Sequence, residues 1–185
     1  MKDLDKTRCF IALDLPREVI NRIKEIQETI KKKNFFYGKF TEPENLHLTL
    51  KFLGEISEQE IGEVKKRLQK INLKEFEASL GELGVFSKEF IRIIWVKLQG
   101  EGLWKLQEEI DNILGGLFVS EKRFMGHITL ARVKKIINKQ ELIDYLKNIK
   151  IKNLRFKVDR FFLKKSELFS EGPVYNDIEK YTLQS

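Results

Sequence analysis

A repeated four-residue motif constrains this chain more than any other feature. Only two histidines occur among its 185 residues, and each begins the pattern His-x-Thr-Leu. One copy is HLTL at residues 47–50 and the other is HITL at residues 127–130, an offset of 80 residues. The flanks match as well, because HLTLKFLGEI aligns with HITLARVKKI. Self-similarity of this kind predicts two halves of similar fold, related by an approximate two-fold axis, with a cleft between them.

The order of the expected elements repeats in the same way. Hydrophobic periodicity predicts strand, helix, strand, helix over about residues 8–71, and the same order over about residues 91–150. Closing strands are expected within residues 154–183. The alternative is two unrelated α/β segments that share an order by coincidence. Since the two copies agree in letters as well as in pattern, we favour the duplication and expect residues 1–185 to form one two-lobed domain.

The individual elements follow from apolar spacing and from capping residues. Ser57 with Glu60 three residues later is a capping box, which predicts a helix beginning there. Gly54 is expected to end the strand before it, and Pro16 suits the first turn of the first helix. The expected strands are 8–14, 46–53, 76–86, 91–98, 127–133, 154–163 and 174–183, and the expected helices are 18–33, 57–71, 103–114 and 139–148.

The strand period explains the spacing inside each motif. Residues i and i+2 of a strand point to the same face, so His47 shares a face with Thr49, and His127 shares a face with Thr129. The intervening leucine and isoleucine side chains would then pack on the opposite, buried face. Symmetry would bring the two polar faces together across the cleft, which predicts a pocket lined by two imidazoles and two hydroxyls.

Two opposed imidazoles suit phosphodiester chemistry. The unperturbed pKa of histidine is about 6.5, so near neutral pH one ring can accept a proton from an attacking water or hydroxyl while the other protonates the leaving oxygen. The threonine hydroxyls can donate to non-bridging phosphate oxygens, and Arg132 could hold the same phosphate through its planar fork. Strict alternation, however, turns Arg132 away from His127. A bulge, or a strand that ends near Ala131, would be needed to bring it into the pocket.

Composition and missing motifs narrow the other classes of function. The net charge of +7 is compatible with a polyanionic partner such as RNA or a phosphorylated small molecule. The sequence lacks a GxxxxGK[ST] loop, which argues against a P-loop nucleotide hydrolase. Two histidines and one cysteine are too few for an ordinary zinc site, although a carboxylate-assisted metal site stays open. Cys9 is expected in the core rather than as a nucleophile, and Ser166 is a further candidate phosphate donor.

The residues around both motifs resemble the two-histidine phosphoesterase superfamily, and more closely the RNA 2′,3′-cyclic phosphodiesterases, also called 2′-5′ RNA ligases. The resemblance covers nearly the whole chain. One departure is Gly126, where many members carry proline before the second histidine. The matching segments are RCFIALDLP (8–16), NLHLTLKFLGE (45–55), FIRIIWVKL (90–98), RFMGHITLARVK (123–134) and LKKSELFSEGPVY (163–175).

This resemblance implies an α+β fold with two antiparallel sheets flanked by helices around a central cleft. It implies hydrolysis of RNA 2′,3′-cyclic phosphodiester ends to 2′-phosphomonoesters without metal or cofactor, and a possible reverse 2′-5′ ligation. His47 would be the proton donor to the 3′ oxygen, and His127 the base that activates water. Thr49, Thr129 and Arg132 match the family's phosphate-contacting positions. The residues alone do not assign the two histidine roles.

A second function stays open at this point. The chain could be a non-catalytic RNA- or nucleotide-binding module that uses the same cleft. The aromatic residues Phe35, Phe36, Tyr37 and Phe40 could stack on bases, although a core or loop position is favoured for them. A single cysteine and an opening segment, MKDLDKTR, without the apolar run of a secretory signal predict a cytoplasmic protein. We also expect a monomer that does not bind membranes, although these features do not determine the oligomeric state.

Overall fold

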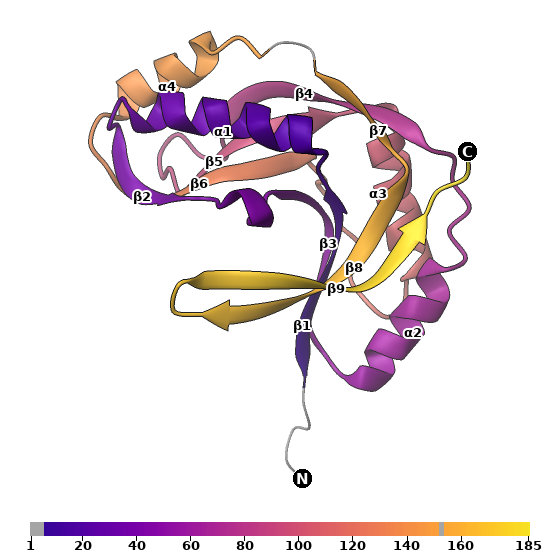
Figure 1. Cartoon of the computed structure of the whole chain (residues 1–185). Coiled ribbons are helices and arrows are strands. Elements are labelled where there is room, and N and C mark those ends of the chain that lie inside the picture. Colours follow the sequence, from indigo (N-terminus) through magenta and orange to yellow (C-terminus); the bar gives the residue numbers. More distant parts are fainter. Residues whose placement is uncertain (1–5, 152–153) are drawn as a thin grey trace.

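The computed structural model describes residues 6–151 and 154–185, so the first five residues of the opening segment lie outside it. The fold is α+β, with one strongly curled antiparallel sheet and helices packed on its outer side (Figure 1). None of the helices in these described residues is long and apolar enough to cross a membrane. The elements are β1 (Thr7–Asp14), α1 (Arg17–Lys31), β2 (Phe36–Phe40), η1 (Pro43–Asn45), β3 (His47–Ile56), α2 (Glu58–Leu68), β4 (Phe76–Val85), β5 (Ile93–Gln99), α3 (Glu101–Ile113), β6 (His127–Ile136), α4 (Lys139–Asn148), β7 (Arg155–Val158), β8 (Arg160–Phe169) and β9 (Gly172–Thr182).

The two lobes share one sheet, so the expectation of two separate sheets was wrong. The strand order is β7-β4-β5-β6-β3-β1-β8-β9, and β2 pairs with the outer part of β6. Between β3 and β6 the ladder consists of one residue pair, Leu48 opposite Ile128. Both side chains are fully buried, which is worth about 1.5–3 kcal/mol each. The halves therefore join through the central residues of the two motifs.

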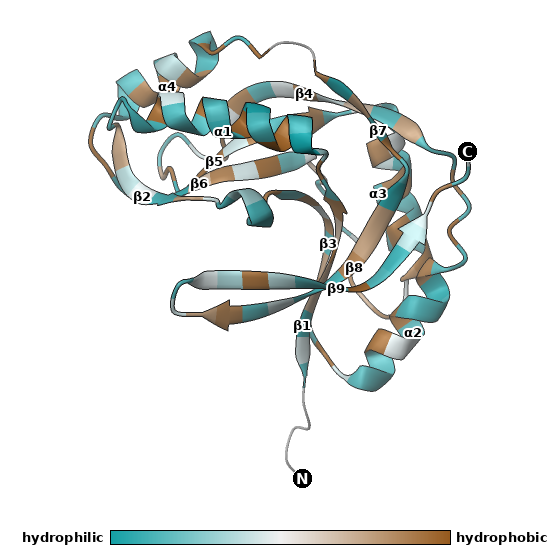
Figure 2. Ribbon diagram, viewed as in Figure 1, coloured by the Kyte–Doolittle hydropathy of each residue, from teal (hydrophilic) through white to brown (hydrophobic). Residues whose placement is uncertain are grey.

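The equivalent helices α1 and α3 each contact the motif-bearing strand of the other half, while α3 and α4 also pack on β4. Helix α1 packs on β6, and α3 packs on β3. The helices are themselves equivalent at the same offset of 80 residues, and both carry a buried glutamine in the middle of an apolar face. Figure 2 shows the alternation of hydrophobic and hydrophilic residues along α1. The matching buried residues are Ile23, Ile26, Gln27 and Ile30 in α1 and Leu103, Leu106, Gln107 and Ile110 in α3.

Most expected elements are confirmed, with three differences. The Ser57–Glu60 capping box is present, and β3 continues through Gly54 to Ile56. The expected strand at 154–163 is two strands, because the chain leaves β7 beside β4 and passes at Asp159 to β8 beside β1. Two polar residues in succession, Asp159 and Arg160, break the alternation at this point, and the expectation of a single strand overlooked that signal. Strand β2 was not expected, since its five residues include a glycine and depend on β6 for their pairing.

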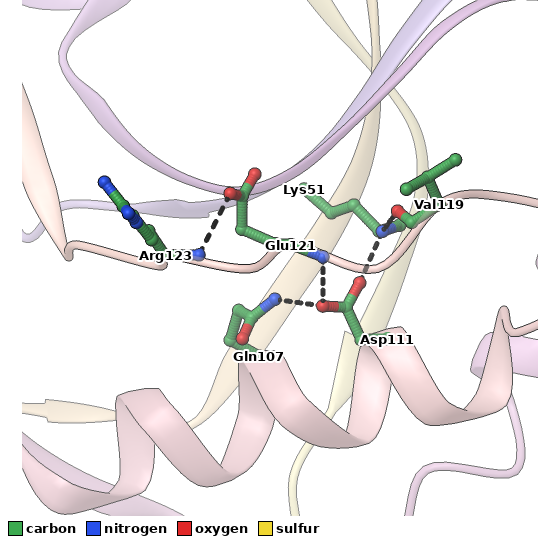
Figure 3. Close-up of polar contacts among 6 residues, drawn as sticks. All are labelled: Lys51, Gln107, Asp111, Val119, Glu121 and Arg123. Atoms are coloured by element: carbon green, nitrogen blue, oxygen red, sulfur yellow. Dashed lines mark hydrogen bonds and ion pairs between the residues drawn. The ribbon is translucent and has the colours of Figure 1, made fainter.

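A buried ion pair ties α3, β3 and the segment before β6 together (Figure 3). Lys51 of β3 donates to the carboxylate of Asp111 and to the carbonyl oxygen of Val119. The same carboxylate accepts from the backbone N–H of Glu121 at 2.8 Å and from the side chain of Gln107 at 2.8 Å. Burial opposes ionisation of this carboxyl, but the Lys51 ammonium and the two other donors outweigh it and lower the pKa of Asp111.

We expect Lys51→Ala to lower the free energy of unfolding by roughly 3–5 kcal/mol, because it leaves the Asp111 carboxylate buried without its cation. The matched control is Lys105→Ala, which breaks the exposed pair with Glu101 on the same helix and should change stability little. Urea denaturation of both variants measures the difference. Equal losses in the two variants would contradict a stabilising role for the buried pair.

Candidate active site

The four polar residues of the two motifs lie together on one face of the sheet. Extending the antiparallel register from Leu48 and Ile128 by one residue places His47 opposite Thr129 and Thr49 opposite His127. All four line the same cleft, which has a volume of about 670 Å³. In a regular ladder, diagonal neighbours such as the two histidines are about 7–8 Å apart. The two histidines and two threonines are therefore neighbours across the pairing of β3 with β6.

A repeated bulge decides which residues follow the motifs into the cleft. In β6 the pairing with β5 passes from Thr129 to Ala131, so that Leu130 is the extra residue. Leu130 and Ala131 are both buried, and the next residue, Arg132, turns to the side of His127 and lines the cleft. The bulge that the sequence requires for Arg132 is therefore present.

The same bulge occurs in β3. There the pairing with β1 passes from Thr49 to Lys51 and omits Leu50, which is the position equivalent to Leu130. It turns Phe52 into the cleft at the position equivalent to Arg132. Sequence reasoning missed Phe52, although the 80-residue offset would have identified it once the bulge was known. At equivalent positions, β6 therefore presents the guanidinium group of Arg132 to the cleft and β3 presents the phenyl ring of Phe52.

A buried glutamine supports the bulge in β6. Gln27 of α1 donates to the carbonyl oxygens of Leu130 and Thr41, both at 2.9 Å. The N–H of Thr41 donates to the same Leu130 carbonyl at 2.9 Å. A bulge removes a carbonyl from the regular ladder, and an unpaired buried carbonyl is costly. Gln27 and Thr41 together satisfy the Leu130 carbonyl and hold the strand in the shape that presents Arg132.

Both imidazoles are oriented by the same type of backbone contact. His47 Nδ1 lies 2.8 Å from the carbonyl oxygen of Asn45, and His127 Nδ1 lies 2.8 Å from the carbonyl oxygen of Met125. A carbonyl can only accept, so each Nδ1 carries hydrogen, and each Nε2 of a neutral ring is a free base. His47 Nε2 lies 3.0 Å from Thr49 Oγ1, whose hydroxyl donates to it in the neutral state.

The surroundings of His47 favour its neutral form. Its ring packs 5.1 Å from the ring of Phe10 and 5.0 Å, edge to face, from the ring of Tyr175. Burial lowers the pKa of His47, and the charges of Lys164 and His127 act in the same direction, while the Asn45 carbonyl and Asp14 oppose them. Asp14 lies opposite His47 on β1 and forms an ion pair of 2.9 Å with Lys164.

His127 has different neighbours although its backbone position is equivalent. The Phe86 ring packs edge to face against it at 4.8 Å, and the residue opposite it on β5 is Lys97 rather than an aspartate. A cation therefore stands where the His47 side has a carboxylate. The two imidazoles share an orientation but not an electrostatic environment.

The remaining candidate residues lie in the cleft, in the core or at the surface. Ser166 and Phe40 line the cleft, whereas Phe35 and Phe36 are core residues and Tyr37 is exposed. Cys9 is buried in the core, as expected, and burial raises the pKa of its thiol to about 11, so it stays protonated near neutral pH. In residues 6–151 and 154–185, no group of three His, Cys, Asp or Glu side chains lies close enough to hold a metal ion.

Comparison with known proteins identifies the family of this chain. The profile described as LigT like Phosphoesterase matches residues 13–95 and again residues 96–175. The chain belongs to this family. The two matches divide the chain within β5, so each contains one of the two motifs.

Relatives of this LigT-like phosphoesterase extend over the same length. A Methanocaldococcus jannaschii protein named RNA 2′,3′-cyclic phosphodiesterase is 33% identical over 94% of this chain and 99% of its own. A Thermotoga maritima protein of the same name is 35% identical over 91% of both chains. Among solved structures, TT0787 of Thermus thermophilus has a TM-score of 0.78 and 31% identity, covering 96% of this chain and 98% of its own. The E. coli LigT apo structure has the same fold, with a TM-score of 0.78 at 22% identity over 98% of this chain and 99% of its own.

The lowered pKa of His47 can be measured directly because the chain has only two histidines. We expect the imidazole NMR signal that is lost in His47→Gln to titrate below the usual value of about 6.5. Because the folded state binds this proton more weakly than the unfolded chain does, acidification through this range should also destabilise the fold. A titration midpoint at or above the usual value would contradict the proposed effect of burial.

Proposed function

We propose that this LigT-like phosphoesterase hydrolyses RNA 2′,3′-cyclic phosphodiester ends to 2′-phosphomonoesters, with the two imidazoles as general acid and general base. The observation that carries the proposal is the juxtaposition of His47 and His127 on one face of the sheet, each with Nδ1 tied to a backbone carbonyl. The names of the relatives support the substrate class. The E. coli LigT, of the same fold, has been crystallised with 3′-AMP.

The proposed reaction proceeds by two proton transfers. Neutral His127 accepts a proton from water at Nε2 while the water oxygen attacks phosphorus. The bond from phosphorus to the 3′ oxygen breaks, and His47, protonated at Nε2, gives its proton to that oxygen. The products are a 2′-phosphomonoester and a free 3′-hydroxyl, with one water consumed. Each transfer is typically worth about 10²–10⁴ in rate.

The anionic substrate makes these protonation states compatible with the low pKa of His47. A phosphodiester bound between the rings places a negative charge next to His47, and a nearby opposite charge favours the imidazolium form. A proton held by a group of low pKa is also given up readily. Thr49 and Thr129 would donate to the non-bridging oxygens, and Arg132 would balance the charge that develops there.

The same arrangement can accept a second nucleophile in place of water. A 2′-5′ linkage between two RNA ends would form when a hydroxyl replaces water as the attacking group, with His127 again accepting the proton. Hydrolysis is favoured in water, so we regard ligation as a secondary activity.

Replacement of His47 or His127 by Ala should each lower kcat by about 10²–10⁴ on an end-labelled RNA that carries a 2′,3′-cyclic phosphate. Wild-type activity should persist after treatment with EDTA, because no proposed step uses a metal ion. Circular dichroism checks that the variants fold. An RNA that is retained but never converted by the wild type would favour the non-catalytic binding module instead.

The two roles can be separated with a substrate whose leaving group needs no proton. On a phosphodiester with a p-nitrophenolate leaving group, His47→Ala should recover most of its lost activity, because the missing acid is no longer required. His127→Ala should stay impaired, because water must still be deprotonated. The reverse pattern of rescue would exchange the acid and base assignments.

A further inference from the structure

The outer end of the β3 side of the cleft has no role in the chemistry proposed above. It is formed by β1 and β3 beyond His47, where Phe10 of β1 lies opposite Phe52 of β3. A series of rings leads outward from the catalytic face, with 5.1 Å between the centres of His47 and Phe10 and 6.4 Å between those of Phe10 and Phe52. Phe52 is 72% exposed although it lines the cleft, so one face of its ring is open to a ligand.

An unpaired cation lies at the same end. Arg8 is two residues before Phe10 on β1, so its side chain starts from the same face of the sheet, and it lines the cleft. Glu55 lies opposite Arg8, yet no ion pair forms between them, and the Arg8 guanidinium has no side-chain hydrogen bond or ion pair anywhere in the described part of the chain. Burial raises the pKa of the Tyr175 phenol, and the charges of Arg132 and Arg8 only partly oppose this rise.

The cleft therefore offers two guanidinium groups, of which a terminal cyclic phosphate engages one. Arg132 is beside the histidine pair through the β6 bulge, whereas Arg8 belongs to the outer end with Phe52. The next phosphate along an RNA chain is complementary to the guanidinium group of Arg8, and an unstacked base is complementary to the open ring of Phe52. Aromatic stacking and backbone phosphate contacts are the usual means of holding single-stranded RNA.

We propose that Arg8 and Phe52 form a subsite for the nucleotide on the 5′ side of the terminal one, with Phe52 stacking on its base and Arg8 binding the phosphate that links the two nucleotides. The substrate class is then an oligonucleotide with a cyclic end, in preference to a nucleoside 2′,3′-cyclic phosphate. This inference rests on the proposed hydrolysis of cyclic phosphate ends.

The test compares kcat/KM on three substrates with 2′,3′-cyclic ends: adenosine 2′,3′-cyclic phosphate, the adenosine dinucleotide, and that dinucleotide with a neutral methylphosphonate link. We expect the wild type to prefer the dinucleotide to the mononucleotide by at least about 10-fold. Arg8→Gln should reduce this preference by roughly 10-fold and should have no such effect on the methylphosphonate substrate. It should also make the salt dependence on the dinucleotide shallower by about 0.7 in log–log slope, the value for one phosphate of a single strand.

Stacking on Phe52 is tested with a separate substrate, a dinucleotide whose 5′ residue is abasic. Phe52→Ala should reduce the preference for the dinucleotide by about 5–100-fold, and this loss should disappear when the 5′ residue of the substrate is abasic. The matched controls are Arg17→Gln and Phe90→Ala, since Arg17 is exposed on α1, Phe90 is 76% exposed, and neither lines the cleft. Both controls should keep the wild-type preference. All four positions are exposed, and thermal melting checks that each variant is folded.

The outcomes separate this inference from the function on which it rests. If the wild type hydrolyses the cyclic mononucleotide and the dinucleotide equally well, or if Arg8→Gln acts equally on the charged and neutral links, the subsite is wrong and the phosphodiesterase activity stands. If the wild type hydrolyses none of the three substrates, the proposed function is wrong and the subsite falls with it.

Discussion

The arrangement of the whole site depends on the contact between Leu48 and Ile128. This one pair joins the two halves of the sheet, and it lies at the centre of the two motifs. Because neighbouring residues of a strand point to opposite faces, burial of this pair exposes the histidine and threonine on either side of each member. A shift of one residue in this register would turn all four polar side chains into the core. The burial of two apolar side chains thus fixes where both imidazoles lie.

The duplicated backbone carries side chains that differ around the two histidines. Each half contributes the same imidazole, hydroxyl, backbone carbonyl contact and bulge. The residue after the bulge is Phe52 in one half and Arg132 in the other, and the residue opposite the histidine is Asp14 in one half and Lys97 in the other. General acid–base catalysis of one displacement needs one ring protonated and the other neutral, so identical environments would serve it poorly. Symmetry places the groups, and these substitutions give the two histidines the unlike environments that the proposed acid and base roles require.

Local patterns were sufficient to predict the parts of this fold that depend on neighbours in sequence. The shared face of His47 and Thr49 follows from the strand period, and the capping box at Ser57 follows from residues three apart. The break between β7 and β8 has a local signal in the successive polar residues Asp159 and Arg160. The partners of the two strands, β4 and β1, could not be predicted, because alternation carries no information about which strand lies alongside. The single continuous sheet was missed for the same reason, since its joining pair brings together residues 80 positions apart.

The bulge in β6 shows a limit of prediction from the sequence. The sequence indicated that a bulge was needed to bring Arg132 into the cleft, but it could not show that the bulge forms. Alternation gives the wrong face for Arg132, and the correction depends on where the Leu130 carbonyl finds its donors. Those donors are the N–H of Thr41 and the amide of Gln27, the latter from a helix 103 residues earlier in the chain. The one feature of the sequence that reflects this bulge is a glutamine, Gln27, within an otherwise apolar helix face. Since Gln107 occupies the same place in α3 and bonds to Asp111, which in turn binds Lys51 beside the β3 bulge, each half holds the functional strand of the other through a buried polar contact. The position of Arg132 in the cleft therefore depends on hydrogen bonds to one buried carbonyl, that of Leu130.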